Sequence, residues 1–315
     1  MYMSAKQAGE KWNISERRVR ILCSEGRVDG VVRSGWAWNI PIDTPKPGDG
    51  RQLRHLKNFD LRAGTMNFSQ LDEERDRCFS QQEDRQQILR SYRHLVNRFI
   101  LGSFACEELS IEQDELFLLF SHCFAPSLDF DTQLLALNCR SILMRFVQET
   151  GLGPIPQTKT TRPFFSEQRL RELYRSLLQG IDDEHMGIYR KGDLPSGGDS
   201  ASSVRLYTVA TQMETLMTQY EREWASLHPV VRSLFFYGEL LRIRPFGRYD
   251  EVFASLVLAG ELLCGGFPPA FVDVRQIDEF KAALILTRKR GNYHNALRML
   301  EQSLLHELAL MMHKE

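Results

Sequence analysis

The sequence predicts a mainly α-helical protein, in which a small helix–turn–helix unit with a β-hairpin precedes a larger all-helical unit. Three observations predict this fold class. After residue 71 apolar residues recur at helical spacing, most clearly at Ile88, Tyr92, Leu95 and Phe99. The only clear strand-like runs are short and lie before residue 42. The stretch DTPKPGDGRQ, rich in Pro, Gly and Asp, separates the two units.

The totals describe an ordinary globular chain. Of 315 residues, 43% are hydrophobic and 26% charged, and the net charge of −1 leaves partner preference to local charge. No apolar run approaches the roughly 18 residues of a membrane span, so a cytoplasmic protein without membrane contact is expected. The cysteines are scattered without a CxxC pair or metal-ligand spacing, so no disulfide, metal or cofactor is expected. They are Cys23, Cys78, Cys106, Cys123, Cys139 and Cys264.

The N-terminal unit reads as two helices followed by a hairpin. Ala5, Ala8 and Trp12 recur at helical spacing, and Ser15 is placed to cap a second helix. The runs RVDGVVR and WAWNIP are strand-like and are joined by a turn at Ser34-Gly35. We therefore expect this unit over residues 1–47.

A linker over 48–70 and a helical unit over 71–315 complete the predicted organisation. Further helices are predicted near 113–124, 132–149, 166–180, 203–222, 228–242, 250–264, 276–288 and 292–313.

Positive charge is concentrated at the N-terminus. Residues 1–54 contain ten Lys or Arg against six Asp or Glu, although the whole chain is near neutral. Arg17, Arg18 and Arg20 crowd the start of the second helix, where a recognition helix meets base edges and phosphates. Arg33 and Ser34, near the hairpin tip, could reach the DNA backbone or minor groove. Solvated arginines on a helical hairpin are the alternative.

The order of these residues resembles the excisionase-like and mercury-regulator-like winged helix-turn-helix modules of bacteria, over residues 3–47. The matching positions are Ser15, Arg18, Val19, Gly26, Arg27, Gly30, Gly35, Trp38, Ile40 and Pro41. The resemblance implies binding to double-stranded DNA, with 15–25 as recognition helix and 31–40 as wing. The residues expected to contact DNA are Ser15, Arg17, Arg18, Arg20, Arg27, Arg33 and Ser34. One module buries little surface, so a homodimer reading two half-sites is expected.

A second resemblance concerns residues 85–300. HPVV begins at His228, and IRPFGRYDEV at Ile243–Val252 stands in the frame of the motif HPFxxGNGR. Fifteen residues then lead to Pro268-Pro269, as in that motif's family. These features resemble the Fic domain, the fold of bacterial AMP transferases, and imply an all-helical Fic-like domain with a short β-hairpin flap.

The residues that would perform the family's chemistry are replaced. Arg244 stands at the histidine that takes the target hydroxyl's proton, and a guanidinium cannot accept a proton near neutral pH. Arg248 stands at the acid that would hold Mg²⁺. Pro245 and Phe246 are retained and can still turn the chain and fill the core. The sequence thus indicates a degenerate loop without a catalytic residue.

The phosphate-binding part of the motif is also changed. The Gly-Asn-Gly turn, whose amides approach phosphate, reads Tyr249-Asp250-Glu251 here, and its two carboxylates are expected to repel a triphosphate. The phosphate-clamping arginines match Val252 and Ser255. Base, metal ligand, anion nest and clamps are therefore all missing together.

Two weaker features lie upstream. SFACEELSIEQDE resembles the family's inhibitory helix, with Ser103 and Glu107 in place, while Glu108 departs from the Gly or Asn of the pattern. GIYRKGDL, at 187–194, resembles the strand before the family's target-docking flap. Arg242 and Arg244 could instead bind an anionic small molecule.

These expectations favour a nucleoid-associated DNA-binding transcriptional regulator. Its inactive Fic-like domain would dimerise, sense a ligand or bind a protein partner. Two alternatives remain: a divergent Fic-type nucleotidyl transferase acting on a protein hydroxyl, and a module that neutralises a toxin.

Overall fold

The computed structural model describes residues 2–24, 28, 31–34, 37–44, 46, 66–80, 85–150, 163–182, 184, 187–190, 209–290 and 292–312. The chain divides into two compact units, Met1–Asn58 and Phe59–Glu315, and the boundary falls inside the expected linker. Each unit has its own hydrophobic core.

The N-terminal unit contains two helices and a small antiparallel sheet. Its elements are β1 (Tyr2–Met3), α1 (Ala5–Trp12), α2 (Glu16–Ser24), β2 (Val32–Ser34) and β3 (Ala37–Pro41). The strand order is β1-β3-β2, with Met3 opposite Ile40 and Arg33 opposite Trp38. The edge strand β1 was not predicted, because two residues are too few to show an alternating pattern.

The turn between α1 and α2 depends on two residues. Asn13 ends α1 in the left-handed conformation, at φ 52°, which Asn tolerates better than most residues. A Cβ on Gly9 would come within 2.9 Å of the Ile14 carbonyl oxygen, so only glycine lets the turn pack this closely on α1. Val19 and Leu22 of α2 then reach the core beside Trp12.

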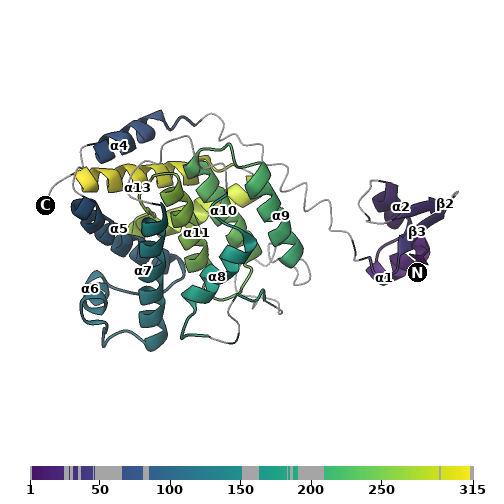
Figure 1. The fold of residues 1–315 in the computed structure, drawn as a ribbon, viewed down its shortest axis with the longest axis horizontal. Coiled ribbons are helices and arrows are strands. Elements are labelled where there is room, and N and C mark those ends of the chain that lie inside the picture. Colours follow the sequence, from purple (N-terminus) through teal and green to yellow (C-terminus); the bar gives the residue numbers. More distant parts are fainter. Residues whose placement is uncertain are drawn as a thin grey trace. The chain divides into compact units, whose positions relative to one another are not determined.

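The second unit is helical throughout its described elements, which confirms the predicted mainly α fold. Its elements are α4 (Ser69–Ser80), α5 (Arg85–Cys106), α6 (Gln113–His122), α7 (Phe130–Thr150), α8 (Glu167–Leu177), α9 (Val209–Arg222), α10 (Pro229–Ile243), α11 (Asp250–Cys264), the 3-10 turn η3 (Val274–Gln276), α12 (Ile277–Arg290) and α13 (His294–Met312). Figure 1 shows α10 and α11 in the middle of this unit, with α5, α7, α8, α9 and α13 packed around them.

Every residue of α11 except the half-buried Glu251 is buried, including the polar Asp250, Ser255 and Glu261. Glu261 is fully buried and accepts hydrogen bonds from the Arg232 guanidinium, at 2.5 Å, and from the Tyr220 hydroxyl. The Tyr220 hydroxyl in turn accepts from the Phe164 amide at 2.8 Å. This network joins α9, α10 and α11 and satisfies a charge that burial alone would make costly.

Two further points concern the expected flap and the membrane. Residues 188–190 form no strand, and residues 191–208, which hold most of the expected flap, lie outside the described part of the chain. None of the described helices is long and apolar enough to cross a bilayer.

Candidate functional site

The loop between α10 and α11 is held by three left-handed residues. Arg244 ends α10 at φ 46°, and its amide donates to the Leu240 carbonyl at 2.7 Å. Gly247 and Tyr249 follow at φ 90° and φ 51°. These backbone angles reverse the chain within a few residues, so that α11 begins at once and returns along α10.

Phe246 anchors the loop in the core. Its ring stacks on Tyr174 at a centroid distance of 3.8 Å and meets Phe253 edge-on at 5.1 Å. The Tyr174 hydroxyl donates to the Arg248 carbonyl at 2.8 Å, which fixes the far side of the turn. Pro245 is buried as well. The plug predicted from the sequence is thus present, but nothing in the sequence indicated Tyr174 as its partner.

Asp250 binds the backbone of its own loop. Its carboxylate is fully buried and accepts from the Gly247 amide at 2.7 Å and from the Phe246 amide at 3.1 Å. Burial raises the pKa of Asp250 to about 6, although the two amides oppose the shift. The carboxylate therefore faces the turn from inside and satisfies its donors, instead of projecting outward toward a phosphate.

The Glu107 carboxylate accepts hydrogen bonds from the next backbone amides of the loop, at the start of α11. It follows α5 directly, and its carboxylate accepts from the amides of Glu251, at 2.9 Å, and Val252, at 3.3 Å. Both amides belong to the first turn of α11, where N–H groups have no acceptor within the helix and an anion is stabilised by the helix dipole. Burial raises the pKa of Glu107, and these two amides counteract the rise.

The end of α5 explains the sequence pattern around Glu107. Ser103 is buried, and its hydroxyl donates to the Ile100 carbonyl at 3.0 Å. Glu108 has φ 62°, the left-handed conformation that Gly or Asn adopts with least strain. Glu108 departs from the Gly or Asn of the inhibitory-helix pattern, but its backbone has the left-handed conformation that Gly and Asn favour.

The two loop arginines lie close to carboxylates of the protein. Arg244 is partly exposed, and its Nε lies 4.0 Å from the Asp250 carboxylate. Arg248 pairs with Asp131 of α7 at 2.8 Å and contacts the Tyr249 hydroxyl at 3.0 Å. A cation at either position can neither accept a proton nor bind a metal ion.

The segment before the expected flap lies against this loop. The Arg190 amide donates to the Pro245 carbonyl at 2.9 Å, and its Nε donates to the Arg244 carbonyl at 2.8 Å. The Tyr189 ring lies 5.5 Å from the Phe246 ring. Residues far apart in the sequence are therefore brought together here by one backbone and one side-chain hydrogen bond that no sequence pattern indicated.

Arg242 is engaged by its neighbours. Its guanidinium donates to Glu239 at 2.8 Å and to Gln212 at 2.6 Å. An anionic small molecule would have to compete with these partners, so the geometry gives Arg242 no open anion site. Among the described residues, no group of three His, Cys, Asp or Glu could hold a metal ion.

In the N-terminal unit, the predicted DNA-contact residues differ in their surroundings. Arg17 is exposed, Arg18 is half-buried, and Arg20 pairs with Glu16 at 2.6 Å. The Ser15 hydroxyl accepts from the Arg18 amide at 3.3 Å and thereby caps α2.

The hairpin residues lie on β2. Arg33 pairs with Trp38 of β3 and Ser34 with Ala37, so they precede the tip. Arg27 lies outside the described residues.

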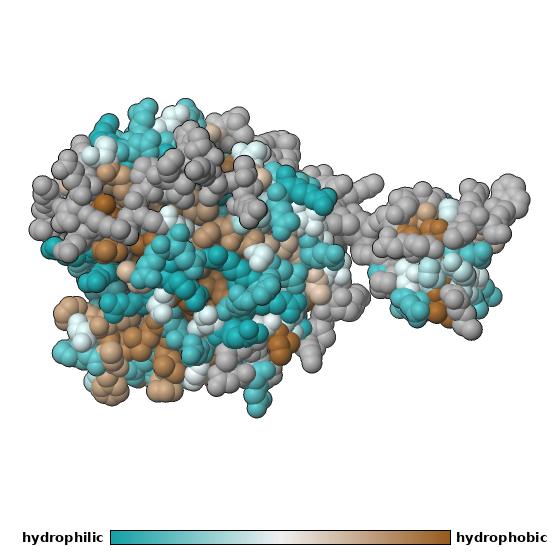
Figure 2. All heavy atoms as spheres, in the orientation of Figure 1, coloured by the Kyte–Doolittle hydropathy of each residue, from teal (hydrophilic) through white to brown (hydrophobic). Residues whose placement is uncertain are grey.

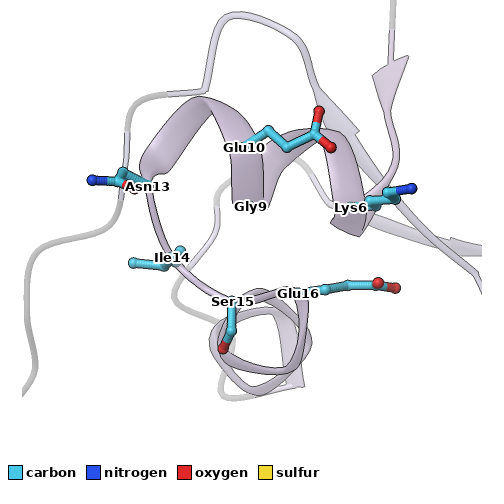
Figure 3. A pocket seen from close by; sticks show the side chains of 7 residues that line it. All are labelled: Lys6, Gly9, Glu10, Asn13, Ile14, Ser15 and Glu16. Atoms are coloured by element: carbon cyan, nitrogen blue, oxygen red, sulfur yellow. The ribbon is translucent and has the colours of Figure 1, made fainter.

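A hollow of about 560 Å³ lies between α1 and the start of α2 (Figure 3). Its walls carry one lysine and two glutamates beside apolar and amide groups, so its charge favours no ligand class. The lining residues are Lys6, Gly9, Glu10, Asn13, Ile14, Ser15 and Glu16.

The arrangement of the α10–α11 loop, its plug and the surrounding helices is that of a Fic fold. Fic-1 (residues 134–508) from C. elegans is similar, with 17% identity and a TM-score of 0.62 over 85% of this chain and 77% of that chain. A Fic-domain-containing signalling protein from Bacteroides thetaiotaomicron gives 19% identity and a TM-score of 0.64 over 78% and 96%. A Fic family protein from Desulfovibrio desulfuricans gives 16% identity and 0.57 over 80% and 77%.

At these identities the likeness shows the fold alone. The family model of Methanogen output domain 1 (MetOD1) matches residues 56–162. No curated protein matches the sequence.

Proposed function

We propose that the protein is a DNA-binding regulator whose Fic-fold unit has no nucleotidyl-transferase activity. One observation carries the second half of this proposal. In the turn that matches Gly-Asn-Gly, the Glu251 amide already donates to the protein's own Glu107 carboxylate, and so does the next amide, that of Val252. A regulator would use this unit for dimerisation or partner binding.

The remaining chemistry of the loop supports the same proposal. Arg244 stands at the position of the Fic motif's proton-accepting histidine, and a guanidinium cannot take a proton from a hydroxyl. Arg248 has the metal position and is paired with Asp131. Nucleotide transfer would require a base, a metal ligand and the release of the Glu107 carboxylate from the amides of Glu251 and Val252, so no single small rearrangement makes the loop competent.

Support for DNA binding comes from the N-terminal unit. Two short helices and a three-stranded sheet present Arg17 and Arg20 on the outer side of α2. Residues 1–54, which include this unit, carry ten Lys or Arg against six Asp or Glu, whereas the whole chain has a net charge of −1. Exposed arginines on the second helix of such a unit are suited to phosphates and to guanine edges in the major groove.

The test is selection of binding sequences from random double-stranded DNA with the full chain, followed by mobility shifts. We expect an enriched motif, and we expect Arg17→Ala to lower the salt slope of log K by about 1. Arg222→Ala, in α9 of the other unit, is the matched control and should change neither the enriched motif nor the salt slope. Failure to enrich any sequence would overturn the DNA-binding role.

A second assay addresses the Fic-fold unit separately. The protein is incubated with labelled nucleotides and a cell lysate, and the label on protein is measured. We expect no transfer. Transfer that is abolished by changes in residues 244–252 would replace the proposal with a divergent transferase.

A further inference from the structure

Glu16 and Arg20 form an ion pair on the outer face of α2. The Arg20 Nη2 donates to Glu16 Oε1 at 2.6 Å, and the side chains of Arg20 and Glu16 are 61% and 42% exposed. Arg17, three residues before Arg20, is exposed on the same face, whereas Val19 and Leu22 are buried in the core. A carboxylate therefore stands among the arginines of the helix that was assigned above to DNA contact.

The position of Glu16 is set by the turn between α1 and α2. Glu16 is the first residue of α2, directly after the capping Ser15. Its backbone packs on α1, since a Cβ on Gly9 would come within 3.4 Å of the Glu16 amide nitrogen. Figure 3 shows the side chains of Ser15 and Glu16 leaving the start of α2 in different directions. A recognition helix meets base edges with its N-terminal residues, so Glu16 lies at that end and Arg20 is held toward it.

The surface of the N-terminal unit suits a polar partner. Figure 2 shows mainly hydrophilic and pale residues on the face of this unit that is in view, with small apolar areas between them. On DNA, the phosphates repel a carboxylate, so a glutamate is favourable in the contact only where it meets a hydrogen-bond donor. In the major groove those donors are the N4 amino group of cytosine and the N6 amino group of adenine.

The Glu16–Arg20 pair is complementary to a guanine and a neighbouring cytosine. A guanidinium has five N–H donors and the bond to Glu16 uses one, so Arg20 can still donate to both O6 and N7 of guanine. The same bond uses only Oε1 of Glu16, and Oε2 can accept from N4 of cytosine. Thymine and guanine present acceptors at this edge, which the carboxylate cannot satisfy. Adenine has its N6 donor beside the N7 acceptor, so cytosine is the better match.

We propose that Glu16 is a specificity-determining residue of α2: it orients Arg20 toward a guanine and accepts a hydrogen bond from N4 of a cytosine in the adjacent base pair. This role of Glu16 rests on the DNA-binding function proposed above and adds the bases that α2 reads. An exposed ion pair that only stabilised the helix would behave differently. Loss of the Glu16 charge would then strengthen binding to every sequence alike and leave the sequence preference unchanged.

The first test compares the sequences that the full native chain and Glu16→Gln select from random double-stranded DNA. We expect a guanine beside a cytosine in the motif of the native chain. In Glu16→Gln the guanine should remain, because Arg20 keeps its donors, and the preference for cytosine should weaken. Glu10→Gln, at an exposed position of α1, removes the same charge from the same unit. It is the matched control and should retain both bases.

Mobility shifts then measure the coupling between Glu16 and the cytosine. Replacing this C·G pair by T·A should weaken binding of the native chain and of Glu10→Gln about 10-fold, and binding of Glu16→Gln less than about 3-fold. The motif and the base-pair change with the native chain require no variant, so they test the role of Glu16 even if Glu16→Gln folds poorly.

The outcomes separate this role from DNA binding itself. A motif without a cytosine beside the guanine, or equal losses in the native chain and Glu16→Gln, overturns the role of Glu16 while DNA binding stands. Failure to enrich any motif overturns both.

Discussion

The carboxylate of Glu107 accepts a hydrogen bond from the backbone amide of Glu251 at 2.9 Å. The end of α5 thereby caps the first turn of α11, a helix 144 residues further along the chain. The Glu107 carboxylate therefore occupies a position at the start of α11 that an anion would otherwise take. Asp250 satisfies the preceding amides, those of Phe246 and Gly247, from inside the loop.

Removing the Glu107 cap should destabilise the helical unit. In Glu107→Ala the amides of Glu251 and Val252 lose their acceptor, and we expect the free energy of unfolding to fall by about 1–2 kcal/mol. Denaturant unfolding measures it. Glu214→Ala, at an exposed position of α9, is the control and should stay within about 0.5 kcal/mol of the native chain. Equal effects of the two changes would contradict a capping role.

The left-handed conformation of Glu108 gives a prediction of opposite sign. Glycine adopts φ 62° without the steric cost that a Cβ imposes, and Glu108 is exposed, so Glu108→Gly should stabilise the protein by about 0.5–1 kcal/mol. Glu108→Ala retains the Cβ and should bring no such gain. Thermal unfolding of the three proteins at one pH makes the comparison. If Glu108→Ala is stabilised as much as Glu108→Gly, the gain comes from removing the Glu108 charge and not from the backbone conformation.

Burial of Asp250 makes stability depend on pH. Its pKa is raised from 3.8 to about 6, so between these values the folded state holds a proton that the unfolded chain has released. The contribution of this group to the free energy of unfolding is therefore fully present below pH 3.8 and is lost as pH rises through 6, by about 3 kcal/mol in all.

Asp250→Asn removes this titration, so the difference in unfolding free energy between native and variant should change across the interval from about pH 4 to about pH 7. Denaturant unfolding at several pH values measures the difference, in which the other carboxylates cancel. A constant difference across the range would mean that Asp250 titrates as an ordinary carboxylate.

The Phe246 plug should be the most sensitive position of the loop. Phe246→Ala leaves a cavity beside Tyr174 and Phe253, and we expect a loss of about 3–5 kcal/mol. Tyr174→Phe keeps the stacked ring and removes only the hydrogen bond to the Arg248 carbonyl, so it should cost about 1 kcal/mol. Chemical denaturation distinguishes the two. A small effect of Phe246→Ala would show that the loop collapses around the cavity.

Introducing the residues of the Fic motif at positions 244 and 248 should not produce nucleotide transfer. In the Arg244→His, Arg248→Asp double variant, the carboxylate introduced at position 248 faces Asp131, and Glu107 and Asp250 still bind the loop amides. The phosphate-clamping arginines also remain absent. Label transfer from nucleotide to protein should stay at background. Transfer by this variant would mean that Arg244 and Arg248 alone prevent the reaction and would contradict the prediction.

The sequence by itself determined the mainly helical class and most helices of the second unit. It also predicted where the loop between α10 and α11 lies, because apolar spacing and the Pro245-Phe246 pair are local signals. The resemblance to the Fic motif placed Arg244 at the position of a base and Arg248 at that of a metal ligand, and this assignment stays a prediction.

Only the tertiary structure decided what the loop's carboxylates do. The sequence predicted that Asp250 and Glu251 would repel phosphate, whereas Asp250 points inward to the amides of Phe246 and Gly247, and Glu107 serves the amide of Glu251. The direction of a side chain depends on packing across long sequence separations. Contacts such as Glu107 to Glu251, or Tyr174 to Phe246, therefore cannot be seen in a local pattern.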